Sequence, residues 1–173
     1  ILYTSGTTGK PKGAELTHCN LFYNAQWLAQ QPMPVALADA VVICVLPLFH
    51  SFGQTVELHG LLSMGSSMAI NDDIPNLLPN LAEVKPTILF AVPRVFNRLY
   101  DGVNKQMSER PGVIQSLFKT GIALGAKRNA GGSLGLVERW RFALADRLIF
   151  SKVRERFGGN LKYAISGSAA LNS

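Results

Sequence analysis

Residues 3–18, YTSGTTGKPKGAELTH, concentrate glycines, hydroxyl side chains and two lysines in one short segment. Glycine permits positive φ and close backbone approach, and successive N–H groups in such a turn form a concavity that binds anions. The residues that could contact a polyphosphate in this way are Thr4, Ser5, Gly6, Thr7, Thr8, Gly9, Lys10 and Lys12. The segment therefore predicts a phosphate-binding loop, with an ordinary flexible turn of the same composition as the alternative.

The spacing of these residues excludes a P-loop of the Walker A class. That class needs two glycines five positions apart, followed by lysine and then serine or threonine. Five positions after Gly6 stands Pro11. A polyphosphate site at this loop must therefore use a different arrangement.

Three segments, in the expected order, resemble motifs of the adenylate-forming (AMP-binding) superfamily, which includes acyl-CoA synthetases, luciferases and peptide synthetase adenylation domains. YTSGTTGKPKG resembles the phosphate-binding signature, LPLFHSFG at residues 46–53 resembles the aromatic–histidine motif, and ISGSAAL at residues 165–171 resembles a segment of the adenine and acyl pocket. Residues 85–103, KPTILFAVPRVFNRLYDGV, are similar to the long-chain fatty acid branch. The resemblance implies that residues 1–173 are one piece of an AMP-binding domain.

The resemblance also implies roles for the matching residues. Residues 4–9 would surround the β- and γ-phosphates of ATP with help from Lys10 and Lys12, and His50 would be the catalytic residue beside the carboxylate and the α-phosphate. Phe49 would lie near the acyl group, whereas His18 and His59 are expected to be structural. The residues expected to line the adenine and acyl pocket are Gly167, Ser168 and Ala169.

The third motif departs from the family pattern at two positions. Ser168 stands where glycine or alanine is common, and Ala170 stands where proline is usual. Serine is only slightly larger, whereas the loss of proline frees φ and restores an N–H group. We therefore expect a less rigid edge of the pocket.

The implied reaction is that of a fatty acid–CoA ligase, with ATP, Mg²⁺ and CoA. A fatty acid attacks ATP to give acyl-AMP and pyrophosphate, and the acyl group then passes to CoA. Two alternatives stay open: a fatty acyl-AMP ligase that delivers to a carrier protein, and a non-catalytic nucleotide- or acyl-binding module. The family's magnesium-binding Glu, ribose-binding Asp and C-terminal domain with its catalytic Lys have no counterpart here, so we expect an internal piece that is inactive alone.

The elements that must position these motifs follow from hydrophobic patterning. Short apolar runs rich in β-branched residues predict strands buried in a parallel sheet, at residues 40–47, 66–70, 87–92 and 160–166. Periodic apolar residues predict helices over 16–31 (with Thr17 as N-cap), 54–64, 77–84, 95–107, 113–127 and 134–157. This alternation predicts an α/β fold, a largely parallel sheet flanked by helices, with ligand-binding loops at the strand ends.

Composition limits the classes of partner. An apolar fraction of 47% suits a packed core, and the net charge of +6 suits an anionic partner such as ATP, CoA or a membrane surface. No recognition-helix, zinc-finger or aromatic-interleaved basic signature indicates nucleic-acid binding. The basic and aromatic pattern of residues 134–157 leaves a peripheral membrane contact as the alternative to a helix packed on the sheet.

The remaining expectations concern compartment and metals. No apolar run is long enough for a membrane span, and no secretory signal is recognisable, so a cytoplasmic location is expected. Cys19 and Cys44 lack the spacing of metal ligands and are expected to be reduced and structural. No residue of this chain is predicted to bind a metal.

Overall fold

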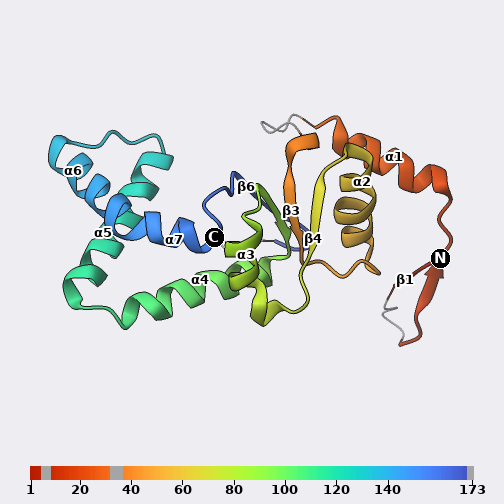
Figure 1. Cartoon of the computed structure of the whole chain (residues 1–173), viewed down its shortest axis with the longest axis horizontal. Helices are drawn as coiled ribbons and strands as arrows, with labels where there is room; N and C mark the ends of the chain where they lie inside the picture. The colour runs from red at the N-terminus through yellow and green to blue at the C-terminus, as the bar shows by residue number, and fades with distance from the viewer. Residues whose placement is uncertain (5–8, 32–36, 171–173) are drawn as a thin grey trace.

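The centre of the computed structural model, which describes residues 1–4, 9–31 and 37–170, is a four-stranded parallel sheet with the order β4-β3-β5-β6. Its strands are β3 (Val41–Cys44), β4 (Ser67–Ile70), β5 (Ile88–Ala91) and β6 (Tyr163–Ser166). Helices cover both faces of this sheet (Figure 1). The predicted α/β fold is therefore confirmed.

Side chains that alternate along β3 and β5 build one core on each face of the sheet. The first core packs beneath the π-helix η2 (Gly53–Gly60) and α2 (Leu61–Met64) and contains Ala40, Val42, Cys44, Leu46, Leu61, Ile88 and Phe90. The second packs against α3 (Leu77–Val84) and α4 (Pro93–Ser108) and contains Ile43, Leu77, Leu81, Leu89, Ala91, Val95 and Leu99. Burial on both faces explains why these strands are uninterrupted apolar runs in the sequence.

The order of the strands reverses between β3 and β5. From β3 the chain crosses through η2 and α2 to β4, and it then returns through η3 (Ile74–Asn76) and α3 to β5 on the other side of β3. Open α/β sheets bind ligands at such a reversal, outside the carboxyl ends of the strands. Residues 46–53 follow β3 and residues 167–170 follow β6, so two of the three predicted motifs lie along this edge.

The N-terminal residues form a feature that patterning did not predict, an antiparallel pair of strands. These are β1 (Leu2–Thr4) and β2 (Lys12–Ala14), which are mostly exposed. The chain then enters α1 (His18–Ala29), which is capped by Thr17. Thr17 Oγ1 accepts from the Asn20 N–H at 3.2 Å, and Asn20 Oδ1 accepts from the Thr17 N–H at 3.0 Å. This reciprocal cap confirms the predicted N-cap, and α1 packs along η2.

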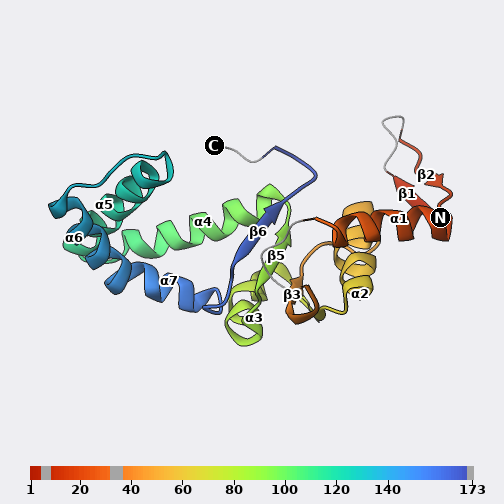
Figure 2. The same ribbon diagram turned by 90° about the horizontal axis from the view of Figure 1, so that it is seen from above.

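Residues 93–157 form a helical arm, which runs from α4 to α7. After α4 it contains α5 (Gly112–Asn129), α6 (Leu136–Ala145), the π-helix η4 (Asp146–Phe150) and α7 (Ser151–Arg156). Figures 1 and 2 show the arm extending from the sheet on the side opposite β1 and β2. Thirteen of the seventeen lysines and arginines lie in the arm, but only five of the eleven aspartates and glutamates. The arm therefore has an excess of eight positive charges, and the rest of the chain an excess of two negative ones.

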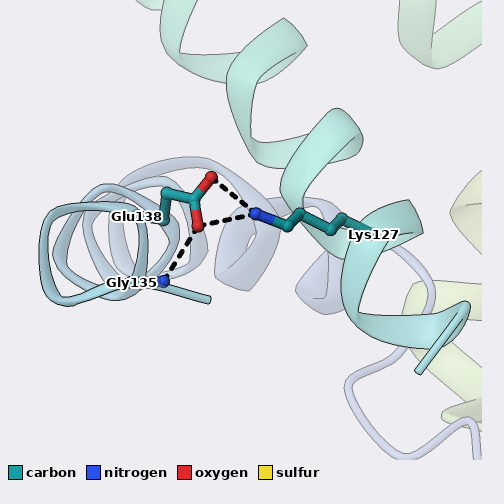
Figure 3. Close-up of polar contacts among 3 residues, drawn as sticks. All are labelled: Lys127, Gly135 and Glu138. Atoms are coloured by element: carbon teal, nitrogen blue, oxygen red, sulfur yellow. Dashed lines mark hydrogen bonds and ion pairs between the residues drawn. The ribbon is translucent and has the colours of Figure 1, made fainter. Parts of the chain in front are cut away.

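The turn between α5 and α6 is closed by one carboxylate (Figure 3). Lys127 Nζ lies 2.9 Å from both carboxylate oxygens of Glu138, and Glu138 Oε2 also accepts from the Gly135 N–H at 2.9 Å. The lysine contact and then the backbone contact hold the pKa of Glu138 below its usual value. The contact links the last turn of α5 to the first turn of α6.

Two further observations complete the fold. Among the described residues no helix combines the length and apolarity needed to cross a bilayer, and no three His, Cys, Asp or Glu side chains group as metal ligands. Both cysteines are free thiols, with Cys19 exposed on α1 and Cys44 buried in β3. Burial, with a smaller contribution from Glu57, raises the pKa of Cys44 to about 12.

Candidate functional site

The loop after β3 turns tightly and presents its aromatic and histidine residues to solvent. The His50 N–H donates to the Pro47 carbonyl at 2.9 Å, and the Gln54 N–H donates to the His50 carbonyl at 2.8 Å, so His50 stands where the following helix begins. Phe49 is 81% exposed, and His50 is also exposed. The two residues are thus available to a ligand at the carboxyl edge of the sheet.

The ring of His50 is held in one tautomer. Its Nδ1 accepts from the Phe52 N–H at 3.3 Å. In the neutral ring the proton is then carried by Nε2, because one ring nitrogen donates while the other accepts. Nε2 can therefore donate to an oxygen of a carboxylate or a phosphate.

A buried carboxylate, Glu57, lies beneath this loop. Its exposed fraction is 0%, and its two oxygens accept separately from the Val45 N–H at 3.1 Å and the Leu46 N–H at 3.0 Å. These two donors follow the last residue of β3, where the ladder to β4 ends. Burial raises the pKa of Glu57 to about 7, although the two backbone hydrogen bonds oppose this change.

Sequence reasoning did not single out Glu57. The signal that could have identified it is a lone glutamate within the segment TVELHGLL, which is otherwise largely apolar and is predicted to be helical. A charged residue on the core side of a helix is rarely buried without partners. Here the partners are backbone N–H groups, which no side-chain pattern reveals.

The second and third predicted motifs contact each other at Gly167. This residue follows β6, and its N–H donates to the Ala91 carbonyl at 3.3 Å. A β-carbon at Gly167 would collide with the ring of Phe52, because two ring carbons lie 2.9 Å from its position. The loop after β3 and the loop after β6 are therefore packed together across the point where the strand order reverses.

Ser168 and Ala169 lie next to this contact and are exposed. Ser168 adopts φ 68°, in the left-handed region that favours glycine. The departure from the family pattern noted above therefore has its main cost in backbone conformation rather than in side-chain size. The adjacent Ser166 has a buried hydroxyl oxygen for which the described residues supply no hydrogen-bond partner.

Replacing Ser168 by glycine is expected to stabilise the chain by about 0.5–1 kcal/mol, because glycine adopts positive φ without the steric cost of a β-carbon. Urea denaturation of the two proteins measures this difference. Ser133→Gly, at an exposed position in the arm where φ is not positive, is the control and is expected to give no gain. Equal stability of Ser168→Gly and the original chain would contradict the predicted strain.

The predicted phosphate loop is only partly described. Ser5, Gly6, Thr7 and Thr8 lie outside the described residues. Thr4 Oγ1 donates to the Lys12 carbonyl at 3.5 Å, Gly9 adopts φ 87°, and Lys10 and Lys12 are exposed. Figures 1 and 2 both place β1 apart from β6 along the long axis of the molecule, and Figure 2 shows β2 beside β1. The structure therefore joins the second and third motifs and leaves the described part of the first apart from the third.

Comparisons with known proteins extend over the whole chain. The family model described as AMP-binding enzyme matches residues 1–173. Long-chain-fatty-acid–CoA ligase FadD15 of Mycobacterium tuberculosis is 33% identical over 179 residues, which cover 100% of this chain and 29% of that protein. Long chain acyl-CoA synthetase 7, peroxisomal, of Arabidopsis thaliana is 33% identical over 172 residues, which cover 99% of this chain and 23% of that protein.

A solved structure is also similar over nearly the full length. The adenylation domain of a carboxylate reductase from Mycobacterium chelonae is 27% identical, with a TM-score of 0.58, over 98% of this chain and 22% of that one. The chain thus spans less than a third of the length of these relatives.

Proposed function

This chain belongs to the AMP-binding enzyme family, and we propose that it is part of a long-chain fatty acid–CoA ligase. The observation that carries the proposal is the packing of Phe52 against Gly167, which joins the aromatic–histidine loop to the loop after β6. The identity of 33% to long-chain acyl-CoA synthetases supports the choice of substrate. On this proposal the complete protein activates a fatty acid with ATP and transfers the acyl group to CoA.

Formation of the acyl adenylate requires hydrogen-bond donors in the site rather than a nucleophilic side chain. A carboxylate is a poor acylating agent, and its conversion to a mixed anhydride with AMP supplies a good leaving group. Attack on the α-phosphate places negative charge on phosphoryl oxygens, which preorganised donors stabilise. His50 Nε2 is such a donor, since Nδ1 is occupied by the Phe52 N–H.

The other residues have supporting roles in this proposal. The exposed Phe49 contacts the acyl group, and Lys10 and Lys12 assist residues 4–9 at the β- and γ-phosphates. The adenine and acyl groups lie against Gly167, Ser168 and Ala169. Mg²⁺, when bound, would neutralise phosphate charge, but the described residues offer no cluster of ligands for it, so no step is assigned to it here.

The test is fatty-acid-dependent exchange of pyrophosphate into ATP by the complete gene product, over a series of acyl lengths, with CoA consumption followed in parallel. We expect exchange that is strongest with long acyl chains, consumption of CoA, and a loss of at least about a hundredfold in Thr7→Ala/Thr8→Ala, the size expected when phosphate donors are removed. Thr120→Ala, in the arm, is the matched control.

Three outcomes would change the proposal. Exchange without CoA consumption would favour a fatty acyl-AMP ligase that delivers to a carrier protein. Nucleotide or acyl binding without exchange would favour a non-catalytic module. Full activity of the double threonine variant would remove the role assigned to the phosphate loop.

A peripheral membrane contact is a second proposal, and α6 supports it. Its outward side carries Leu136, Val137 and Trp140, which are 85%, 67% and 66% exposed, with Arg139 and Arg141 beside them. Apolar residues flanked by arginines on one helix suit the interface of an anionic bilayer. Cosedimentation of the complete gene product with anionic vesicles should fall several-fold in Trp140→Ser but not in Trp27→Ser on α1; equal binding to neutral vesicles would contradict this.

A further inference from the structure

Glu57 connects the two ends of the loop that carries Phe49 and His50. The side chain belongs to η2, which follows the loop, whereas its hydrogen-bond partners, the Val45 and Leu46 N–H groups, precede it. With the carboxylate in place, residues 47–52 are held as a closed turn. The Glu57 carboxylate is inaccessible to water, because the exposed fraction of this residue is 0%.

Only the ionised carboxylate satisfies both donors fully. Each oxygen of an ionised glutamate is an acceptor without a hydrogen. A glutamine in its place puts an NH2 donor against one backbone N–H, and protonation of the glutamate adds a hydrogen to one oxygen and weakens that oxygen as an acceptor. The two hydrogen bonds, at 3.1 Å and 3.0 Å, are therefore strongest when Glu57 is ionised.

We propose that Glu57 is a positioning residue for the candidate site: its carboxylate, bound to the Val45 and Leu46 N–H groups, fixes the turn that presents Phe49 and His50 to the acyl and phosphate groups. This inference deepens the proposed function and rests on it. Glu57 does not touch a substrate in this scheme, and it acts through the backbone on either side of the turn.

The charge of Glu57 is expected to change near neutral pH, since its pKa is raised to about 7 by burial. The Cys44 thiol on β3 interacts electrostatically with Glu57, and burial, which raises its pKa to about 12, keeps it protonated in this range. On α1, which packs along η2, the titratable residues His18, Cys19 and Tyr23 are exposed. On η2 itself, His59 is half-buried, and α2 has no titratable residue.

The experiment compares the complete gene product with its Glu57→Gln variant, and Glu83→Gln, an exposed carboxylate on α3, serves as the control. Hydrogen exchange of the Val45 and Leu46 amides is measured from pH 6 to pH 8.5 and corrected for the intrinsic rate. We expect at least tenfold faster exchange in Glu57→Gln at pH 8.

The kinetic measurement is kcat/KM for the fatty acid in the pyrophosphate exchange reaction over the same pH range. We expect kcat/KM of Glu57→Gln to be at least tenfold below that of the original protein at pH 8. The difference should be much smaller at pH 6, where the original Glu57 is protonated and therefore neutral like the glutamine. A variant damaged only in folding would lose activity at both pH values, and no less at pH 6 than at pH 8, because the stability of the variant relative to the original chain rises with pH. Exchange rates and kinetics like those of Glu83→Gln, or an equal loss at every pH, would overturn the proposal.

The two proposals fail in different ways. If the unaltered protein shows no pyrophosphate exchange, the proposed function is wrong, while the amide measurement still reports whether Glu57 holds the turn. If the unaltered protein is active and Glu57→Gln is equally active with unchanged amide exchange, the positioning role alone is wrong.

Discussion

Gly53→Ala is expected to destabilise the chain by about 3 kcal/mol, near the upper end of the usual cost of overpacking a core. Gly53 is buried at the start of η2, where a β-carbon would overlap the Pro47 carbonyl oxygen and lie 3.1 Å from the Leu46 Cβ. The obstacle is backbone, so it has no alternative rotamer. The loop with Phe49 and His50 would have to move away from the helix that follows it.

The measurement is urea denaturation, and the arm offers a matched control of opposite sign. Gly102 lies inside α4 with open space at the β-carbon position. Gly102→Ala is therefore expected to stabilise the chain by up to about 1 kcal/mol, the ordinary helix preference for alanine over glycine. If Gly53→Ala were as stable as Gly102→Ala, the close approach to Pro47 would be wrong.

Ionisation of Glu57 is expected to remove about 3 kcal/mol of stability between pH 4.5 and pH 8, since each unit of pKa change corresponds to about 1.4 kcal/mol. The pKa is about 7 in the folded chain and 4.5 in its ordinary environment. Below pH 4.5 the group is protonated in both states and its contribution is fully present. Between these values the folded state binds more protons, so stability is lost as the pH rises through 7.

Comparison with Glu57→Gln isolates this effect, because other groups titrate alike in both proteins. Urea denaturation from pH 4.5 to pH 8 should show the variant gaining about 3 kcal/mol relative to the original chain. Cys44 does not interfere, since burial keeps its thiol protonated over this range. A difference in stability that does not change with pH would contradict the raised pKa. With the pKa raised to about 7, ionised Glu57 lowers stability above neutral pH, although on our proposal it shapes the candidate site.

The sheet and its helices could be predicted because their signals are local. The apolar runs that became β3 and β5 are buried on both faces, and the periodic segment that became α3 is reproduced with the predicted bounds. The pair β1 and β2 was missed because three-residue strands with exposed side chains have no alternation to detect. The composition of that segment describes a turn equally well.

For the candidate site, the sequence proposes residues but does not predict their contacts. Motif resemblance proposes His50 and Gly167 as site residues, but the collision that excludes a β-carbon at Gly167 arises from Phe52, more than a hundred residues earlier in the chain. Glu57 was missed because its partners are backbone amides. At Ser168 the sequence indicates only a small change in side-chain size, whereas the cost of this serine follows from its positive φ, which the sequence does not reveal.

The difference in net charge between the helical arm and the rest of the chain affects how the molecule is oriented near a charged surface. An excess of positive charge at one end and of negative charge elsewhere gives the chain a permanent electric dipole along its long axis (Figure 1). A dipole experiences a torque in an electric field. Near an anionic surface the chain is therefore rotated before contact, so that the arm faces the surface. This orientation operates within a Debye length, about 8 Å at physiological ionic strength, and added salt is expected to abolish it.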